Sequence, residues 1–66
     1  MKRLVCTPAE AAEALVTSPD KVRELIQSGE IPAYREGRNF KIVISLLQVY
    51  IEERAMGETE RRKNGQ

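Results

Sequence analysis

The chain has 66 residues, enough for one domain with a small core, because a chain of this size buries only roughly 60% of the surface that its unfolded form exposes. Eleven lysines and arginines stand against ten aspartates and glutamates, and the resulting net charge of +1 excludes a polycation that coats nucleic acid by charge alone. One cysteine and no histidine exclude an intramolecular disulfide and argue against a structural zinc site.

The first predicted element is a helix over residues 8–15. Thr7 fits the N-cap, Pro8 the first helical position, and Glu10 the place three residues after the cap where a capping box has its acid. Alanines fill most of the positions that follow, and these small side chains allow another helix to approach closely.

A second helix is predicted over residues 19–28, after a turn of three residues. Ser18 and Pro19 repeat the pattern of a cap followed by proline, and Gly29 supplies the expected stop. One apolar stripe at helical spacing is made of Val22, Leu25 and Ile26. Two helices joined by so short a turn indicate a helix-turn-helix.

The next segment predicts a β-hairpin, with two short runs on either side of a turn at Glu36 and Gly37. Because glutamate is unfavourable at positive φ, we predict a type I turn with Gly37 left-handed, and a register that pairs Arg35 with Arg38. The predicted core face carries Ile31, Ala33, Phe40 and Ile42. The opposite face carries Tyr34, Asn39 and Lys41.

A third helix is predicted over residues 46–55, with Ser45 as its N-cap and Gln48 in the capping-box position. Its expected core residues are Leu47, Tyr50 and Ile51. The single cysteine, Cys6, is expected to pack as a small hydrophobic side chain.

The sequence after the third helix has no apolar periodicity from Gly57 onward. This pattern predicts a folded domain over residues 1–56 and a disordered polar tail over residues 57–66. Three basic residues of this tail fit either phosphate contacts or plain solvation: Arg61, Arg62 and Lys63.

The most specific motif is Ser28-Gly29-Glu30-Ile31-Pro32-Ala33-Tyr34-Arg35, followed by Gly37-Arg38. With Thr7-Pro8-Ala9-Glu10-Ala11-Ala12 before it and Leu47 and Tyr50-Ile51 after it, the chain over residues 4–52 resembles the excisionase-type DNA-binding family. These are small winged helix-turn-helix domains related to the MerR-type regulators. The resemblance implies an α+β fold of three short helices with a two-stranded β-hairpin as a wing.

The resemblance also implies double-stranded DNA as the partner, with helix 19–28 in the major groove and wing 31–43 in the neighbouring minor groove. Family members often bind repeated sites beside an attachment sequence on phages and other mobile elements. There they bend the DNA and direct an integrase towards excision. Other members are small transcription regulators.

Candidate DNA contacts lie on both elements. On the helix they are Ser18, Lys21, Arg23, Glu24 and Gln27. On the wing they are Arg35, Arg38, Asn39 and Lys41. Basic side chains bind phosphate or guanine, glutamine reads adenine, and a helix N-terminus holds phosphate. The wing strip 35–41 has a net charge of +2, which suits a narrow and electronegative minor groove. The plain alternative is that both elements are ordinary solvated surface.

The predicted third helix is apolar on more than one face because of Leu46 and Val49. Such excess is typical of a contact surface, which would serve a neighbouring copy on the DNA or an integrase. The alternative is that both residues enlarge a small core.

Three functions therefore stay open: an excisionase-type protein, a small MerR-like transcription regulator, and a helix-turn-helix that contacts protein and has lost DNA binding. Glu24 and Gln27 favour the last, because a basic residue is common at these positions in the family. Without histidine, a cysteine pair or a phosphate-cradling glycine loop, we expect no enzyme, small-molecule substrate, cofactor or metal. No apolar run approaches the roughly 18 residues of a membrane span, and we expect a cytoplasmic protein.

Overall fold

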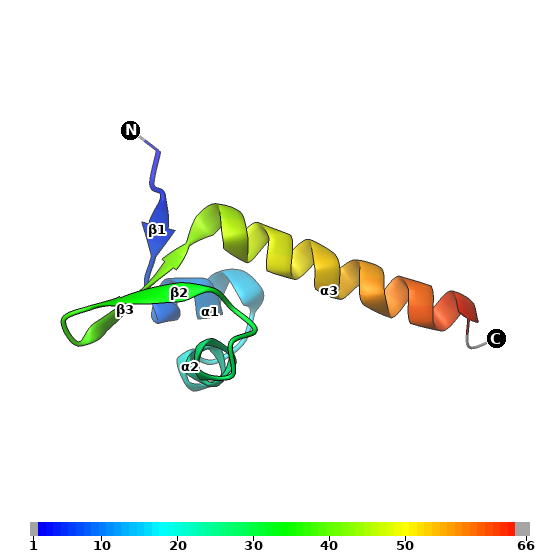
Figure 1. The fold of residues 1–66 in the computed structure, drawn as a ribbon, viewed down its shortest axis with the longest axis horizontal. Helices are drawn as coiled ribbons and strands as arrows, with labels where there is room; N and C mark the ends of the chain where they lie inside the picture. Colours follow the sequence, from blue (N-terminus) through cyan, green and yellow to red (C-terminus); the bar gives the residue numbers. More distant parts are fainter. Residues whose placement is uncertain (1, 65–66) are drawn as a thin grey trace.

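The computed structural model describes residues 2–64, and the side chains of residues 2–59 (Figure 1). Its elements follow in the order β1 (Val5–Cys6), α1 (Pro8–Leu15), α2 (Pro19–Gln27), β2 (Ala33–Glu36), β3 (Asn39–Val43) and α3 (Ile44–Asn64). Over the described residues, this is the predicted α+β fold with its helix-turn-helix and its β-hairpin wing.

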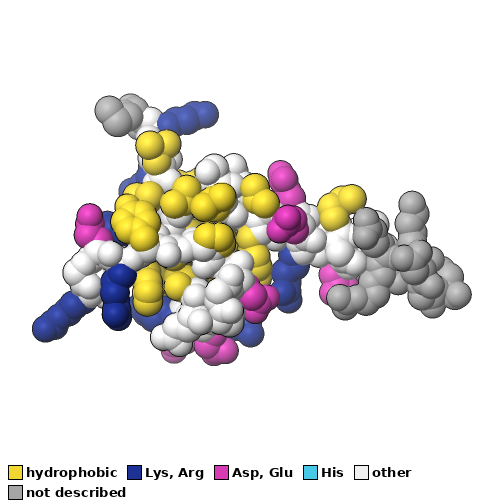
Figure 2. Space-filling model, in the orientation of Figure 1, with side chains coloured by type: hydrophobic (Ala, Val, Ile, Leu, Met, Phe, Trp, Pro, Cys, Tyr) yellow, Lys and Arg dark blue, Asp and Glu magenta, His cyan; other side chains and the backbone are white. Residues whose placement is uncertain are grey.

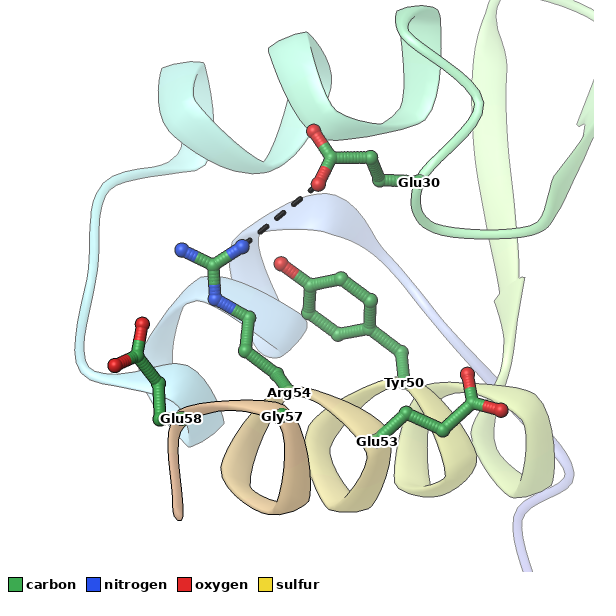
Figure 3. Close-up of a pocket in the computed structure, with 6 residues that line it drawn as sticks. All are labelled: Glu30, Tyr50, Glu53, Arg54, Gly57 and Glu58. Atoms are coloured by element: carbon green, nitrogen blue, oxygen red, sulfur yellow. Dashed lines mark ion pairs between the residues drawn. The ribbon is translucent and has the colours of Figure 1, made fainter. Parts of the chain in front are cut away.

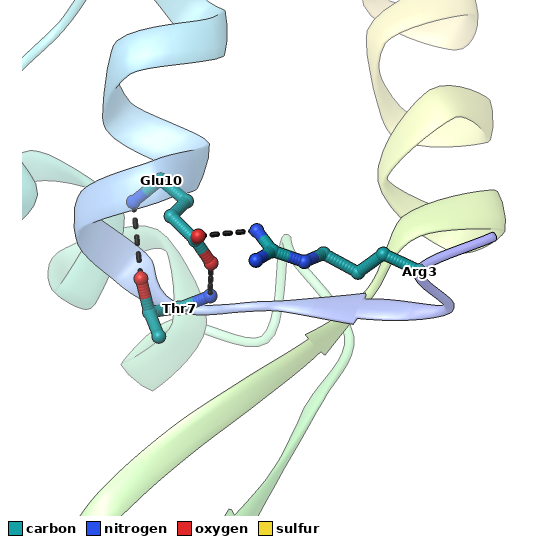
Figure 4. Close-up of polar contacts among 3 residues, drawn as sticks. All are labelled: Arg3, Thr7 and Glu10. Carbon is teal, nitrogen blue, oxygen red and sulfur yellow. Dashed lines mark hydrogen bonds and ion pairs between the residues drawn. The ribbon is translucent and has the colours of Figure 1, made fainter. Parts of the chain in front are cut away.

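Two of the three predicted helix starts are confirmed at the level of individual hydrogen bonds. Thr7 Oγ1 accepts a bond of 3.1 Å from the Glu10 backbone N–H, and Glu10 Oε1 accepts one of 2.9 Å from the Thr7 N–H (Figure 4). Ser18 Oγ accepts a bond of 3.2 Å from the Lys21 N–H. Each cap satisfies a backbone donor that the first turn of a helix leaves without a partner.

The turn between α1 and α2 places a β-branched residue in a left-handed conformation. Val16 has φ +57° and ψ +52°, and its N–H bonds to the carbonyls of Ala12 and Glu13. Its side chain is 91% exposed, so packing does not compensate for the strain. Left-handed backbone costs an L-residue roughly 1–2 kcal/mol, which identifies this turn as a strained point of the helix-turn-helix.

The sheet contains a strand that sequence analysis did not predict. Its order is β1-β3-β2, with both pairs antiparallel, so β3 lies in the centre. Val5 pairs with Val43 and Cys6 with Ile42. The Ile44 N–H then donates to the Leu4 carbonyl over 3.0 Å. With two residues, β1 is too short to show an alternation of polar and apolar residues in the sequence. It joins the sheet by pairing with the free edge of β3.

The predicted register of the hairpin is wrong by two residues. Arg35 pairs with Phe40 instead of Arg38, and Glu36 pairs with Asn39. Gly37 and Arg38 form the turn, with Gly37 at φ +64° and Arg38 outside the left-handed region. Positive φ at the first central residue alone is the pattern of a type II′ turn, whose twist suits a two-residue hairpin better than the type I turn predicted.

The register error leaves the faces of the hairpin unchanged, because a shift of two residues preserves the alternation of side chains. Ala33 and Ile42 face the core as predicted. The buried hydrophobic residues come from all parts of the fold up to the start of α3: Cys6, Ala11, Ala12, Val22, Ile31, Ile42 and Leu47. The buried alanines of α1 bring α2 close, and Cys6 packs as a small hydrophobic residue as expected.

The third helix is longer at both ends than predicted. It begins at Ile44, directly after β3, so Ser45 lies inside its first turn and is not the N-cap. Its backbone continues through Gly57 to Asn64, where sequence analysis predicted a disordered tail. Residues 65–66 of that predicted tail lie outside the described residues, and the division of the chain at residue 56 stays a prediction.

Only the first part of α3 packs on the body of the protein. Leu47 is buried and Tyr50 is half-buried against the core, whereas every side chain from Ile51 to Thr59 is exposed. Figure 1 shows the helix running away from the sheet, towards the end of the molecule opposite the hairpin tip. No helix among the described residues is both long enough and apolar enough to span a membrane.

Candidate nucleic-acid interface

The outward face of α2 is defined by its one fully buried residue, Val22. Successive residues of a helix are turned by about 100°, so the residues that point furthest from the core are Asp20, Glu24 and Gln27. All three are exposed. Lys21 and Arg23 lie on the two flanks between these residues and the core. The centre of the exposed face is therefore acidic and amide-bearing, and the two cations lie at its borders.

Neither flanking cation of α2 is free to point straight outwards. Arg23 Nη1 lies 3.2 Å from Asp20 Oδ1, one helical turn earlier. Lys21 lines an open groove between α2 and α3, together with Leu25 and Tyr50. Because both partners are largely exposed, the Arg23–Asp20 pair is weak and either a phosphate or water can replace it.

The wing distributes its cations around the hairpin tip. Arg38 occupies the turn itself. Arg35 lies on the inner face, where its guanidinium stacks 5.3 Å from the centroid of the Phe40 ring opposite it in the ladder. Lys41 lies on the outer face, with Nζ 4.0 Å from Glu36 Oε1. Lys and Arg side chains mark the hairpin end of the molecule in Figure 2.

Sequence analysis did not predict two contacts of the wing cations. The Phe40 ring contacts Arg35, and the Glu36 carboxylate lies near Lys41. The Phe40 ring holds the Arg35 guanidinium by a cation–π contact, which a partly exposed pair makes worth roughly 0.5–1 kcal/mol. The signal for this contact was the face that both residues share, but the predicted register placed Arg38 opposite Arg35. Asn39 lies opposite Glu36 at the start of β3, exposed and next to the turn.

A groove lies between α3 and the helix-turn-helix, and its lining includes Leu15, Thr17 and Lys21 on one side and Tyr50 and Arg54 on the other. Its volume is about 570 Å³, and it is open along its length. Arg54 Nη1 lies 3.7 Å from Glu30 Oε1 and so links α3 to the loop that leads into β2. Figure 3 shows the Tyr50 ring on α3 beside this ion pair. Because both side chains are largely exposed, this ion pair is a weak link. Of the two basic residues predicted on α2, Lys21 lines the groove and Arg23 does not.

The two residues predicted for protein contact are accessible on α3. Leu46 and Val49 are 43% and 45% exposed, so neither is an interior residue of the core. Leu4 and Tyr34 are further large hydrophobic side chains that the fold leaves exposed. Figure 2 shows hydrophobic side chains gathered over the middle of the face in view.

Two titratable groups near the start of α1 have shifted pKa values. The Thr7 backbone N–H and then the Arg3 guanidinium stabilise the Glu10 carboxylate, which lowers the pKa of Glu10 (Figure 4). Burial is the main cause that raises the pKa of the Cys6 thiol, which keeps it in the unreactive protonated form. Neither group is among the candidate DNA contacts, and both have structural roles.

A comparison with protein families decides the class of this fold. A family described as "Helix-turn-helix domain" matches residues 5–55, which include β1, both helices of the motif, the wing and the packed half of α3. The chain belongs to this helix-turn-helix family. That family includes excisionase-like domains.

The family match supports a DNA-binding role for this helix-turn-helix protein and points away from an enzyme. Neither a curated protein nor a solved structure matches the chain. The structure places the wing candidates together around one tip. It divides the α2 candidates among the helix N-terminus, two flanks and an outer face.

Proposed function

We propose that the protein is a sequence-specific DNA-binding protein of the excisionase type. It acts in the cytoplasm, where it binds chromosomal or mobile-element DNA. In this proposal α2 enters the major groove and the wing, residues 31–43, enters the adjacent minor groove. Several copies bind side by side and bend the DNA, which directs an integrase towards excision. The observation that carries the proposal is the arrangement of cations around the wing tip.

The wing fits between two phosphate backbones. A hairpin that enters a minor groove has one backbone on each side, and this hairpin has Arg35 on one face, Lys41 on the other and Arg38 at its tip. A narrow minor groove has an enhanced negative potential that attracts inserted arginine. The net charge of +2 on residues 35–41 therefore lies where such a groove would need it.

The recognition helix supports the proposal by size and by its N-terminus. With nine residues, α2 is about 14 Å long at a rise of 1.5 Å per residue, which suits a major groove roughly 12 Å wide. Ser18 caps its N-terminus and is exposed there, and the positive end of a helix favours a phosphate. Lys21 and Arg23 on the flanks are placed to contact the backbones that border the groove.

The small number of cations explains why several copies are proposed. If Lys21, Arg23, Arg35 and Arg38 each neutralise one phosphate, log Kd changes with log salt by a slope of about 3.6, and affinity falls on the order of 10²-fold from 50 to 200 mM salt. One copy then binds modestly. Neighbouring copies, or an integrase, add affinity through the exposed Leu46 and Val49.

The test is fluorescence anisotropy with mixed-sequence and repeated-site duplexes between 50 and 200 mM salt. We expect salt-dependent binding with that slope, and binding curves on repeated sites that are steeper than on single sites. The variant Leu46→Asp is expected to bind a single site normally and to lose the steepness. Tight one-to-one binding to a short site would contradict the multiple-copy mode, and cooperativity unchanged in Leu46→Asp would exclude this surface.

A second candidate is a helix-turn-helix that contacts another protein and no longer binds DNA. The acidic centre of α2, formed by Asp20 and Glu24, favours it. The same titration separates the two candidates, because a protein-contact module gives no salt-dependent signal with any duplex. A small transcription regulator would bind DNA as the excisionase-type protein does, and an adjacent integrase gene distinguishes them.

A further inference from the structure

Two acids, Asp20 and Glu24, hold the most outward positions of α2, and Glu24 is the one without an ion pair among the described residues. It lies two residues from the buried Val22 and is exposed. Among the described residues, no cation lies within ion-pair distance of its carboxylate, whereas Asp20 on the same face is paired with Arg23. If α2 lies in a major groove, an uncompensated negative charge is brought between two phosphate backbones. A duplex then binds well only where it offers this carboxylate a partner.

Only a hydrogen-bond donor can be the partner of this carboxylate. An ionised carboxylate accepts hydrogen bonds and donates none. In the major groove the donors are the exocyclic amines, cytosine N4 and adenine N6, whereas guanine and thymine present the acceptors O6, N7 and O4. A glutamate in the groove is therefore satisfied by an amine and repelled by an acceptor, in addition to the repulsion from every phosphate nearby.

We propose that Glu24 is a specificity-determining residue of the interface, whose carboxylate accepts a hydrogen bond from a base amine in the major groove, cytosine N4 or adenine N6. This inference rests on the proposed DNA-binding function and assigns the base chemistry that α2 selects. The same carboxylate weakens binding to every duplex without an amine at that position. Glu24 thus reduces affinity for random DNA and increases discrimination.

Gln27 extends the same contact line. It lies one helical turn beyond Glu24 on the outward face, about 4.5 Å further along the helix axis, and is exposed. Base pairs follow one another about every 3.4 Å along one strand, so the two side chains reach neighbouring base pairs. Glutamine binds adenine N6 and N7 through two hydrogen bonds. The inferred target therefore has an amine-bearing base next to an adenine.

The experiment compares the wild-type chain with Glu24→Gln and with a control, Glu52→Gln, which removes the same charge from an exposed position of α3. Each protein selects sites from a randomised duplex pool at 50 mM salt, and its affinity for unselected duplex is measured. We expect Glu24→Gln to bind unselected duplex roughly 3- to 10-fold tighter than the wild type, because one negative charge leaves the groove. Glu52→Gln should match the wild type.

The selected sites provide the decisive comparison. Wild-type sites should show one position enriched in cytosine or adenine that Glu24→Gln sites lose, and changing that base to thymine should weaken wild-type binding roughly 5- to 100-fold. Which of the two bases is enriched identifies the amine. Sites with the same preferences in both proteins, or guanine or thymine at that position, overturn the inference while the DNA-binding function stands. A wild type that binds no duplex overturns both.

Discussion

The recognition helix and the wing contain similar residue types but present them differently. On α2, Arg23 is paired with Asp20 and Lys21 lies at the groove towards α3, while the outward face consists of Asp20, Glu24 and Gln27. On the wing, Arg38 stands in the turn, and Arg35 and Lys41 lie on opposite faces of the hairpin. Under the proposed function, this nearly neutral protein places its cations on the wing and at the flanks of α2, and its hydrogen-bonding groups at the centre of α2.

The largest expected effect is on the wing. Replacing Arg38 by alanine should weaken DNA binding roughly 10-fold and reduce the salt slope by about one, because one cation at the tip is lost. Its melting temperature should stay nearly unchanged, since Arg38 is exposed and has no described packing role. Titrations at several salt concentrations and a thermal melt measure the two quantities. Lys2→Ala, an equal change of charge at the N-terminal end, is the control, and an equal loss of affinity there would remove the wing's special role.

The two turns behind these elements differ in their backbone strain. Gly37 takes the left-handed conformation at the wing turn, where nothing lies within 4 Å of an added Cβ, whereas Val16 takes it at the helix turn. Val16→Gly should stabilise the protein by about 0.5–1 kcal/mol, because relief of strain exceeds the added entropy of the unfolded chain.

For a domain of this size, that gain raises the Tm by about 3–6 °C. Gly37→Ala should have the opposite sign, with a loss of about 1 kcal/mol, because alanine is strained at φ +64°. Calorimetry of both variants beside the wild type measures the two changes. A Val16→Gly variant that melts below the wild type would show that the exposed valine makes a contact that the fold requires.

A smaller effect is expected from freeing Arg23. Asp20→Asn removes its partner and one negative charge from α2, and because an exposed pair is worth about 0.2–1 kcal/mol, DNA affinity should rise by up to about fivefold. Glu52→Gln again controls for net charge. If Asp20→Asn binds DNA more weakly, Asp20 itself contacts the target and the division between helix and wing is too simple.

The smallest effect concerns the start of α1. The pKa of Glu10 is lowered in the folded protein, so its stabilising contribution is present above its unfolded pKa and is lost as pH falls through the lowered folded value. We expect the Tm difference between wild type and Glu10→Gln to be largest at neutral pH and to shrink in acid. Melts between neutral pH and pH about 3 measure it. A difference that is constant with pH would assign the effect to the capping geometry alone.

Sequence analysis predicted most, but not all, of the parts of the fold that depend on local chemistry, since the predicted cap at Ser45 and the predicted turn type were wrong. Both caps, at Thr7 and Ser18, rest on residues within three positions of each other, and both were predicted correctly. The parts that depend on distant pairing were missed or misplaced. β1 exists because β3 offers it an edge, and the hairpin register follows from the preference for Gly37 at the first turn position instead of from the strand pattern.

The candidate site shows the same limit. The residue types that carry charge could be selected from the sequence, but their directions could not. The contact of Arg35 with the Phe40 ring needed the true register, and the pairing of Arg23 with Asp20 needed the side-chain positions. The continuation of α3 to Asn64 could not be predicted either, because its last turns have no apolar stripe.

The central place of β3 has a consequence for how this protein meets its target. The strand that forms the wing is hydrogen-bonded on its other edge to β1, and β1 is followed at once by the Thr7 cap of α1. The wing and α1 are thus joined through one continuous sheet. In the proposed complex, a duplex that contacts both the wing and α2 would then have to supply most of the curvature. The protein would then bind more tightly to DNA with TA or CA/TG steps, because these steps bend easily. This preference would hold even at base pairs that no side chain contacts.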